Sequence, residues 1–418
     1  MRNKTPLGWT SWPPDNATMI AIAGAGLSGL SCALALHRRG KKCTVFEALG
    51  SVGGRQRTAR HGGFTLDHGF QVVLDSYKSV SAVCEIPTLD PRHFESGAIV
   101  HACGRTMRLR SPMENPAAAA FSPVLPFPDK LRLALLGLEI LCTPDSKLLA
   151  RCASPSDQST RDFLSGRGFS PASIGRFFQP FFGGVLLDNA LSSSAGLFLY
   201  YLKKFCTGRA WVPAGGIQAL PESIAAQLPA GTIRFHSRAM EIRGNTLLLE
   251  SGERIEFDQA VLALDEPSLH RLLRLPAPPP APGVSVVYFE SSESLYPQRC
   301  IVLPAGADRL VRHFVQTTNI APEFAPPGKH LISATVLGPE CNPEAALREI
   351  AEVFPKAASC LRHLETIRVP YAVPAQPPGF AAKTPPPLPP NVHACGDWRN
   401  GASIETAIRS GLELAERL

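Results

Sequence analysis

The sequence predicts an α/β fold, in which helices flank a parallel sheet and a second, α+β part is inserted into the chain. Three observations lead to this prediction. A chain of 418 residues is long enough for two domains. An apolar run, a glycine turn and a helix open the fold at 19–40, and a second strand follows at 43–47. Short strands return around 213–262, and a last strand and helix close the chain.

The first elements form a compact unit. Residues 19–24 are a short continuous apolar run, as expected of a strand that is buried on both faces. The helix after the glycine turn is about a dozen residues long and ends at Gly40. CTVFE at 43–47 is the second strand, so a β-α-β unit is complete within about 30 residues. FTLDHGFQVV at 64–73 is also strand-like and lies close to this unit.

The middle of the chain changes character. Residues 110–205 contain stretches with helical apolar spacing, such as 129–141 and 194–205, and predict a mostly helical insertion. The strands expected within 213–262 are TIRFH, AMEIRG, TLLLE, ERIEF and DQAVLAL, and tight turns such as ESGE join them.

Two proline-rich segments, at 275–283 and 374–390, divide the rest of the chain. Between them, VSVVYFE, RLVRHFVQTT and HLISATVL predict strands of an antiparallel sheet, and residues 343–354 predict a helix. After the second proline-rich segment, NVHACGD predicts the last strand and SIETAIRSGLELAERL the last helix.

Composition excludes several classes of function. The formal net charge of +7 is small for a chain of this length, and the basic residues are dispersed along it. The sequence therefore shows no basic cluster of the kind that binds nucleic acid. Eleven cysteines without a CxxC pair fit a reducing cytosol rather than a disulfide framework or a zinc site. No apolar run approaches the roughly 20 residues of a spanning helix. We therefore expect a cytoplasmic protein without a bound metal, and peripheral membrane contact remains open.

The first 18 residues lack the apolar core of a signal peptide. Met19 directly precedes the first strand. Either Met1 or Met19 is therefore a candidate start of the chain.

The glycine turn carries the first functional signal. Gly24, Gly26 and Gly29 form GxGxxG between the strand and the helix. Their spacing permits a tight turn, close approach of the backbone to a pyrophosphate and close strand–helix packing. Glu47 closes the next strand, where a carboxylate can accept hydrogen bonds from a ribose diol. These features predict a Rossmann-like dinucleotide-binding unit.

A second glycine segment indicates which dinucleotide binds. GSVGGRQRT at 50–58 places Gly53, Gly54 and Arg55 just after the acid, and ACGDWRNGASIETAIRSG at 394–411 ends the chain. Together with GxGxxG, these segments resemble the flavoprotein superfamily of flavin amine oxidases, in its branch of protoporphyrinogen oxidases and phytoene (carotenoid) desaturases. The resemblance implies FAD as cofactor and an FAD-binding domain of the GR2 type.

The resemblance also implies roles for individual residues. Asp397 would hold the ribityl chain, and the backbone at Ser403 and Ile404 would face the pyrimidine end of the flavin. A helix N-terminus there favours the negative charge of reduced flavin. Thr406 stands where the family usually has glycine. The cysteine-linked members carry their cysteine shortly before the final strand, and 374–394 contains none, so non-covalent binding is expected.

Two further segments match the family. Residues 211–228 resemble its P-x-GG segment, and residues 233–264 resemble its adenine-side strands, with Ala239 at the position of a small apolar residue. The complete set that the resemblance assigns to FAD is Gly24, Gly26, Leu27, Ser28, Gly29, Glu47, Gly54, Arg55, Gly69, Ala239, Gly396, Asp397, Ser403 and Ile404. The implied FAD-binding domain consists of 19–80, 206–270 and 370–418. The implied substrate domain consists of 81–205 and 271–369.

The substrate side is less specific. Amine-oxidising members usually carry a lysine near the flavin and an aromatic pair, but no lysine occurs between Lys204 and Lys329. Tyr371 and Trp398 are candidates for an aromatic cage, and both could equally be wall or core. The aromatic and aliphatic stretch 178–202 suits an apolar tunnel, although such a stripe is also typical of core.

Near the flavin, the resemblance places His68, for which structural packing is the alternative role, and Gln71, which could hydrogen-bond near the ring. Asp67 is expected to hold its own turn. The leading hypothesis is an FAD-dependent oxidoreductase that dehydrogenates a hydrophobic small molecule by hydride transfer to flavin N5, with oxygen or a quinone as electron acceptor. The alternatives are a flavin amine oxidase acting on a polyamine or amino acid, and a flavin-binding protein without turnover. No second GxGxxG supports a nicotinamide dehydrogenase.

Overall fold

The first sheet is fully parallel. A computed structural model describes residues 18–112, 114–306, 308–383 and 385–418. Its five-stranded sheet is the frame of the dinucleotide-binding part, and each neighbouring pair runs in parallel. The strands lie in the spatial order β10 (Ile233–Arg234), β2 (Cys43–Phe46), β1 (Ile20–Ala23), β14 (Gln259–Leu262) and β20 (Val392–Ala394).

The turn from β1 into α1 (Leu27–Arg38) depends on two glycines. Gly24 has a φ of +103°, and a Cβ at this position would lie 2.5 Å from the carbonyl oxygen of Ala263. A Cβ at Gly29 would lie 2.0 Å from the carbonyl oxygen of Gly24. Only glycine fits such a close approach of two backbones. The predicted β-α-β unit is confirmed, with boundaries within one or two residues of those expected.

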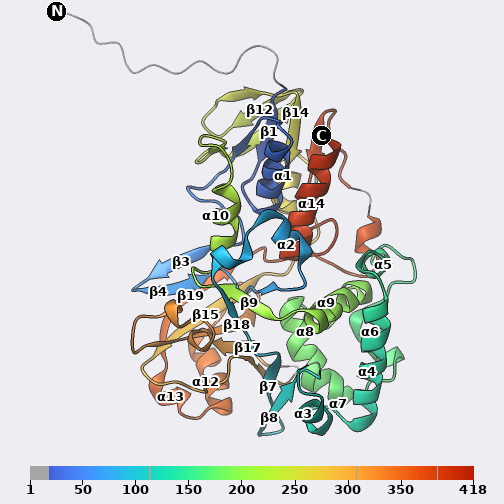
Figure 1. Cartoon of the computed structure of the whole chain (residues 1–418), viewed down its shortest axis with the longest axis vertical. Helices are drawn as coiled ribbons and strands as arrows, with labels where there is room; N and C mark the ends of the chain where they lie inside the picture. Colours follow the sequence, from blue (N-terminus) through green and yellow to red (C-terminus); the bar gives the residue numbers. More distant parts are fainter. Residues whose placement is uncertain (1–17, 113, 307, 384) are drawn as a thin grey trace, which may run out of the picture.

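The last helix packs against the first (Figure 1). α14 (Ile404–Arg417) runs alongside α1, and the Ser31 hydroxyl donates a hydrogen bond to the carbonyl oxygen of Ile408 at 3.0 Å. A Cβ at Gly411 would lie 2.1 Å from the carbonyl oxygen of Ser28. The two ends of the fold therefore share one core, and the glycine sets how closely the helices approach.

Smaller elements surround this core. An antiparallel meander contains the strands predicted from residue 239 to residue 257. A separate antiparallel hairpin follows the second glycine segment and ends at Asp67. The meander consists of β11 (Ala239–Arg243), β12 (Thr246–Leu249) and β13 (Arg254–Glu256), and the hairpin of β3 (Thr58–His61) and β4 (Phe64–Asp67). A third small sheet joins β5 (Val73–Leu74), β9 (Ala210–Pro213) and β6 (Pro91–His93), and the helices of this part are α2 (Lys78–Val83), α10 (Ala219–Ala225) and α11 (Glu266–Leu272).

The second large sheet has seven strands. Their spatial order is β19 (Arg362–Val369), β15 (Val284–Ser291), β18 (His330–Leu337), β17 (Val311–Gln316), β16 (Ile301–Pro304), β7 (Gly97–Ala102) and β8 (Arg105–Arg110). The three predicted strands β15, β17 and β18 pair antiparallel, as expected. The sheet as a whole is mixed, because β7, which was not predicted, pairs with β16 in parallel. α12 (Pro343–Val353) and α13 (Ala357–Cys360) also belong to this part.

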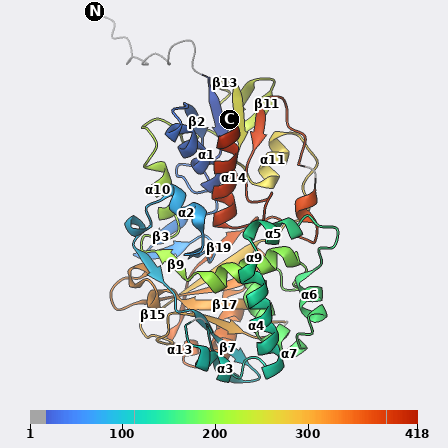
Figure 2. The same ribbon diagram turned by 45° about the vertical axis from the view of Figure 1, so that its right-hand side comes forward.

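The remaining segment is helical, as predicted for 110–205. It contains α3 (Pro116–Phe121), α4 (Phe127–Cys142), α5 (Asp145–Arg151), α6 (Thr160–Gly166), α7 (Pro171–Ser173), α8 (Gln179–Val185) and α9 (Ala195–Thr207). Figures 1 and 2 show these helices and the seven-stranded sheet at one end of the molecule, and the parallel sheet with α1 and α14 at the other.

Two observations concern the predictions of a reducing compartment and of no membrane-spanning helix. All eleven cysteines are free thiols. Within the described ranges, none of the helices combines the length and the apolar character needed to cross a bilayer. The candidate leader, apart from Thr18, lies outside the described residues.

Candidate functional site

A single large cavity connects the two ends of the molecule. Its volume is about 1450 Å³, which exceeds the roughly 300–1,000 Å³ of a pocket for one drug-sized ligand. One end is lined by the glycine turn after β1, and the other by the helices α3 and α4. The cavity is therefore large enough for a dinucleotide and a second, sizeable molecule.

The glycine turn forms the floor of the first end. Gly26 precedes α1, and no side chain caps the first N–H groups of this helix. The N–H of Gly53 donates to the carbonyl oxygen of Ala25 at 2.9 Å, which draws the second glycine segment against the first. A Cβ at Gly26 would meet no atom within 4 Å. Uncapped N–H groups beside open space are suited to a phosphate.

Glu47 is fixed beside this floor. Its Oε2 accepts a hydrogen bond from the N–H of Ala25 at 2.8 Å, and its Oε1 accepts one from the N–H of Leu49 at 2.9 Å. The side chain is buried, yet it lines the cavity. Each carboxylate oxygen retains acceptor capacity, so Glu47 can hold a pair of hydroxyl groups.

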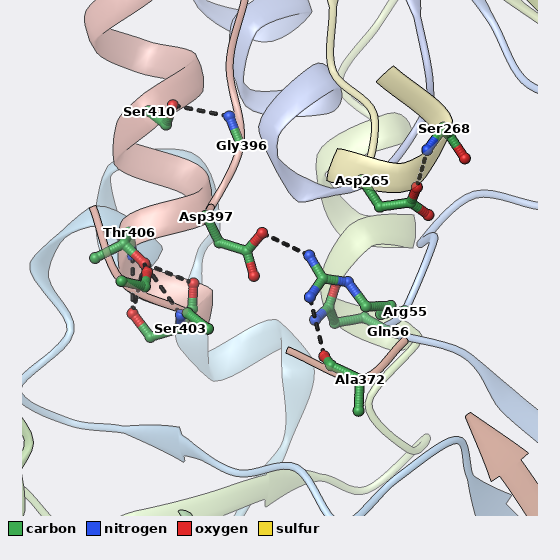
Figure 3. A network of polar contacts seen from close by, with 12 residues as sticks. Arg55, Gln56, Asp265, Ser268, Ala372, Gly396, Asp397, Ser403, Thr406 and Ser410 are labelled. Atoms are coloured by element: carbon green, nitrogen blue, oxygen red, sulfur yellow. Dashed lines mark hydrogen bonds and ion pairs between the residues drawn. The ribbon is translucent and has the colours of Figure 1, made fainter. Parts of the chain in front are cut away.

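The two end motifs of the sequence meet in an ion pair (Figure 3). Arg55 Nη2 lies 2.6 Å from Asp397 Oδ1, and Arg55 Nη1 donates to the carbonyl oxygen of Ala372 at 2.9 Å. Both charged side chains line the cavity, and that of Asp397 is only 9% exposed. Arg55 thus joins the glycine segment after β2 to the loops on either side of β20.

α14 begins with a complete capping box (Figure 3). The Ser403 hydroxyl accepts from the N–H of Thr406 at 3.1 Å, and the Thr406 hydroxyl accepts from the N–H of Ser403 at 3.1 Å. Thr406 is fully buried and does not line the cavity, whereas Ser403 and Ile404 do. The threonine that replaces the family's glycine is therefore turned into the cap rather than toward the cavity.

His68 and Gln71 lie in the loop between β4 and β5, and both line the cavity. Gln71 Nε2 donates to the carbonyl oxygens of Arg55 at 2.8 Å and His68 at 2.9 Å. Burial lowers the pKa of His68, and the nearby Arg57 lowers it further. Gln71 thereby fixes this loop against the second glycine segment.

Asp67 does not hold its own turn, contrary to expectation. Its Oδ1 accepts from the Thr58 hydroxyl at 2.6 Å and from the N–H of Ile217 at 3.0 Å. The carboxyl group therefore ties the β3–β4 hairpin to the glycine segment after β9. Its burial raises the pKa of Asp67 to about 6.

The two aromatic candidates lie outside the cavity lining. Trp398 packs against the core cluster of the parallel sheet, and its indole N–H is buried without a partner. Tyr371 lies beside Arg55, whose guanidinium carbon is 5.6 Å from the centre of the tyrosine ring. The cavity geometry therefore does not support an aromatic cage built from these two side chains.

The other predicted site residues gather at one end of the cavity. Gly29 is the exception among the proposed cofactor contacts, because it packs against Gly24 behind the turn. The proposed contacts that line the cavity are Gly24, Gly26, Leu27, Ser28, Glu47, Gly54, Arg55, Gly69, Ala239, Gly396, Asp397, Ser403 and Ile404.

The stretch 178–202 is divided between core and cavity. Phe178, Phe182 and Phe198 are fully buried in the helical core. Phe181 and Tyr201 line the cavity. Core side chains and cavity-lining side chains therefore alternate along the same helices. Part of the stretch is core, and part of it lines the cavity.

A histidine that the sequence did not single out lies in the wall of the cavity. His313 on β17 lines it together with its cross-strand neighbour Thr335, whose hydroxyl lies 2.9 Å from His313 Nε2. A Cβ at Gly184 would lie 2.6 Å from His313 Nδ1. The ring of Phe70 contacts the imidazole edge to face, with 4.8 Å between centres. The GG break in α8 therefore makes room for the imidazole.

We expect His313 to weaken the fold in acid. Burial lowers its pKa to about 4, with Arg312 as a second cause. Between pH 6.5 and 4 the unfolded chain binds a proton that the folded chain excludes, so the free energy of unfolding falls as pH falls. From pH 7 to pH 5 this group should cost about 2 kcal/mol. Urea unfolding of the wild type and of His313→Asn at both values measures the difference, and equal pH slopes would contradict it.

The first end of the cavity fits FAD. The uncapped N–H groups of α1 can bind a pyrophosphate, and the two acceptor oxygens of Glu47 can bind a ribose diol. The space above Gly26 admits a close ligand. Among the described residues, no group of three His, Cys, Asp or Glu side chains could hold a metal ion.

Comparison with known proteins gives a family match over most of the chain. The model of the family described as flavin containing amine oxidoreductase matches residues 27–418. A phytoene dehydrogenase of Streptomyces griseus is 26% identical over 394 residues, which cover 81% of this chain and 76% of that protein. A 4,4'-diapophytoene desaturase of Staphylococcus aureus is 40% identical over 67 residues, which cover 16% of this chain and 13% of that protein.

Solved structures share the fold. An oxidoreductase from Methanosarcina mazei superposes with a TM-score of 0.73 at 17% identity, over 95% of this chain and 100% of that one. A putrescine oxidase bound to putrescine superposes with a TM-score of 0.71 at 20% identity, over 97% and 99% of the two chains.

Proposed function

Because this chain belongs to the family of flavin-containing amine oxidoreductases, we propose that it dehydrogenates a hydrophobic substrate, of the carotenoid, isoprenoid or porphyrinogen class. The chain is an FAD-dependent oxidoreductase. Bound FAD supplies a hydride acceptor at N5, and oxygen or a quinone then takes the electrons. The residues of the chain bind the cofactor, orient the substrate and accept the proton.

The wall of the cavity carries this proposal. Beyond the glycine turn, the lining is largely aliphatic and aromatic, from Phe70 and Phe94 through Phe181 and Phe205 to Leu138. Such a wall binds an apolar molecule through burial of its surface and gives a polar one few partners. The sequence relatives named for phytoene and diapophytoene support the same substrate class.

The charges of the cavity argue against a cationic amine. The carboxylates among the described lining residues are Glu47, Glu95, Asp265 and Asp397. Glu47 and Asp397 belong to the cofactor end, and Glu95 Oε2 is paired with Arg108 at 2.7 Å. Asp265 caps α11, because its Oδ1 accepts from the N–H of Ser268 at 2.8 Å. An amine oxidase acting on a polyamine is the alternative function, and the likeness to putrescine oxidase, at 20% identity, supports it only through the shared fold.

His313 supplies the remaining chemical group. A desaturation removes one hydride and one proton, and the proton needs only a weak acceptor. The imidazole of His313 is neutral above its lowered pKa. It lies in the wall of the cavity, where β17 packs against α8, with Thr335 as its partner. We assign it the role of proton acceptor or of a polar contact that orients the substrate.

The proposal is tested by anaerobic reduction of the purified protein. We expect a bound flavin that absorbs at about 450 nm and that bleaches when a polyene such as phytoene is added in detergent. A panel of polyamines and amino acids should leave the spectrum unchanged. Bleaching by an amine alone would establish the amine oxidase instead, and no bleaching by any donor would indicate a flavin-binding protein without turnover.

Gly137→Phe should narrow the outer cavity without disturbing the fold. Gly137 lines the cavity, and a Cβ there would meet no atom within 4 Å. A phenyl ring would occupy space that a long substrate needs, and we expect at least a tenfold loss of turnover with a polyene. Flavin content should stay unchanged. Gly166→Phe on α6, where a Cβ also meets nothing, is the control outside the cavity, and equal turnover of both variants would contradict the prediction.

We further propose that the protein works in the cytoplasm and takes its substrate from a membrane surface. An apolar substrate of this class dissolves in lipid rather than in water, so the enzyme has to meet it there.

A further inference from the structure

An exposed apolar surface lies on α3 and α4. Among the described residues, nine large apolar side chains are exposed, and six of them fall within the stretch 121–141. We name these six the α3–α4 patch: Phe121 at 87% exposed, Phe127 at 78%, Leu131 at 57%, Leu135 at 59%, Leu138 at 61% and Leu141 at 38%. A concentration of this kind marks a binding surface rather than the ordinary scatter of apolar side chains.

The spacing of the patch along α4 is helical. Phe127, Leu131, Leu135 and Leu138 follow one another at intervals of four, four and three residues, so they share one face of the helix. The opposite face is also apolar, because Leu136 and Ile140 are buried in the helical core. α4 therefore packs into the core through its buried face, and the fold does not need the exposed leucines on its outer face.

The patch surrounds an opening of the cavity. Leu138 and Leu141 are exposed and at the same time line the cavity. Ala120 at the end of α3 and Lys130 on α4 line it as well, and Lys130 Nζ donates to the carbonyl oxygen of Ala120 at 2.6 Å. The apolar wall of the cavity thus continues onto the outer surface at this point.

Two basic side chains lie at the same opening, and a third lies on the neighbouring strand β8. Arg110, at the end of β8, and Lys130 both line the cavity beside the patch. Arg105 is exposed at the start of β8, the strand that contacts α3. In the part of the chain that the structure describes, no carboxylate forms an ion pair with these three side chains. Figures 1 and 2 place α3 and α4 at the end of the molecule away from the C-terminus.

We propose that the α3–α4 patch docks the protein onto the surface of an anionic lipid bilayer, so that the cavity opens directly into the hydrocarbon region. The patch would enter the boundary between headgroups and acyl chains, and Arg105, Arg110 and Lys130 would contact the anionic headgroups. The inference rests on the proposed function in one respect, since an apolar substrate could then enter without crossing water.

A bilayer fits this surface better than a protein partner does. A protein seated on the patch would also cover Leu138 and Leu141, where the cavity lining reaches the surface, and would close the cavity there. Lipid would leave the cavity in contact with the phase in which an apolar substrate dissolves. The combination of apolar and basic side chains also supplies the two signals that peripheral attachment requires.

The test is co-sedimentation of the holoenzyme with two kinds of vesicle, phosphatidylcholine alone and phosphatidylcholine mixed with phosphatidylglycerol. We expect at least tenfold stronger binding to the anionic vesicles, and its loss at high salt. Leu131→Ser/Leu135→Ser should weaken that binding at least tenfold, because neither residue lines the cavity or packs in the core. Phe235→Ser is the matched control, since Phe235 is 42% exposed but lies outside the patch.

A second variant checks the same surface by gain of signal. In Leu135→Trp, the emission of the introduced tryptophan should shift to shorter wavelength when anionic vesicles are added, because the indole leaves water. The inference would be overturned by vesicle binding that survives Leu131→Ser/Leu135→Ser, by absence of binding in the wild type, or by a dimer in solution that this double variant dissociates.

The two proposals can fail separately. Dehydrogenation of a detergent-dissolved polyene, without vesicle binding, would overturn the docking surface and leave the proposed function intact. Vesicle binding through the patch, without bleaching of the flavin by any polyene, would do the reverse.

Discussion

Gly26→Ala is expected to remove FAD from the protein while leaving the folded apoprotein as stable as before. Gly26 has a φ of −77°, which any residue adopts, and an added Cβ would meet no protein atom within 4 Å. The same Cβ would stand in the space above the uncapped N–H groups of α1, where the pyrophosphate is expected. Pushing a phosphate away from these donors should weaken binding at least 100-fold, or about 3 kcal/mol. Titration of the apoprotein with FAD measures the affinity, and thermal unfolding measures the stability.

Two other glycine-to-alanine variants are controls for the loss of FAD expected in Gly26→Ala. Gly166→Ala at the end of α6 also adds a Cβ that meets nothing, and it should leave both FAD affinity and the stability of the fold unchanged. Gly29→Ala should instead damage the fold itself, because its Cβ would clash with the backbone of Gly24. Normal FAD affinity in Gly26→Ala would show that the glycine turn is not the pyrophosphate site.

Arg55→Ala is expected to destabilise the apoprotein by about 2 kcal/mol, because it leaves a buried carboxylate without its partner. The side chain of Asp397 is 9% exposed, and its Oδ1 is the atom that Arg55 contacts. The side chain of Arg55 is 27% exposed, so partial hydration reduces the loss below that of a fully buried pair. Urea unfolding of the apoprotein at pH 7 gives the difference.

The double variant separates charge from packing. Arg55→Ala/Asp397→Asn removes the unpaired charge and should recover about 1 kcal/mol relative to Arg55→Ala alone. Arg55→Lys keeps the charge but has to forgo one of the two contacts to Asp397 and Ala372, and it should lie between the wild type and the alanine variant. If the double variant were less stable than Arg55→Ala, the ion pair would not explain the effect.

The sequence was sufficient for the elements that depend on local spacing. The α/β class is confirmed, as are the FAD cofactor and the family resemblance. Gly24 and Gly29 show why, since a turn that tolerates no Cβ leaves a fixed glycine pattern in the sequence. Helical periodicity likewise predicted α4 and α9 to within a few residues.

Contacts between distant segments were beyond such reasoning. Arg55 and Asp397 are 342 residues apart, and nothing in the sequence around either residue indicates that the two form an ion pair. His313 was missed because its strand, RHFVQ, is buried at every position, so alternation gives no sign of which side chains face a cavity. The hairpin β7–β8 and the edge strand β19 were also missed. Arginine occupies half of β8, and most residues of β19 are charged or polar, which weakens the apolar signal of both strands.

The role of aromatic residues could not be read from periodicity either. Phe178 and Phe181 are three residues apart on the same helical segment, yet one is core and the other lines the cavity. Which of them is free to contact a ligand depends on how α8 packs against β17, where Gly184 makes room for His313. That packing is a property of the folded chain.

The packing of α14 on α1 has a consequence for how the protein is made. The parallel sheet needs β20 as its edge strand, and α1 needs α14 to cover Ser31 and its apolar neighbours. Both of these partners are translated after everything else in the described fold. While the ribosome is still at work, the nascent chain therefore carries a dinucleotide cradle whose closing half does not yet exist. The complete cradle can therefore form only once β20 and α14 have emerged from the ribosome, and until then the apolar side chains of α1 lack the helix that covers them.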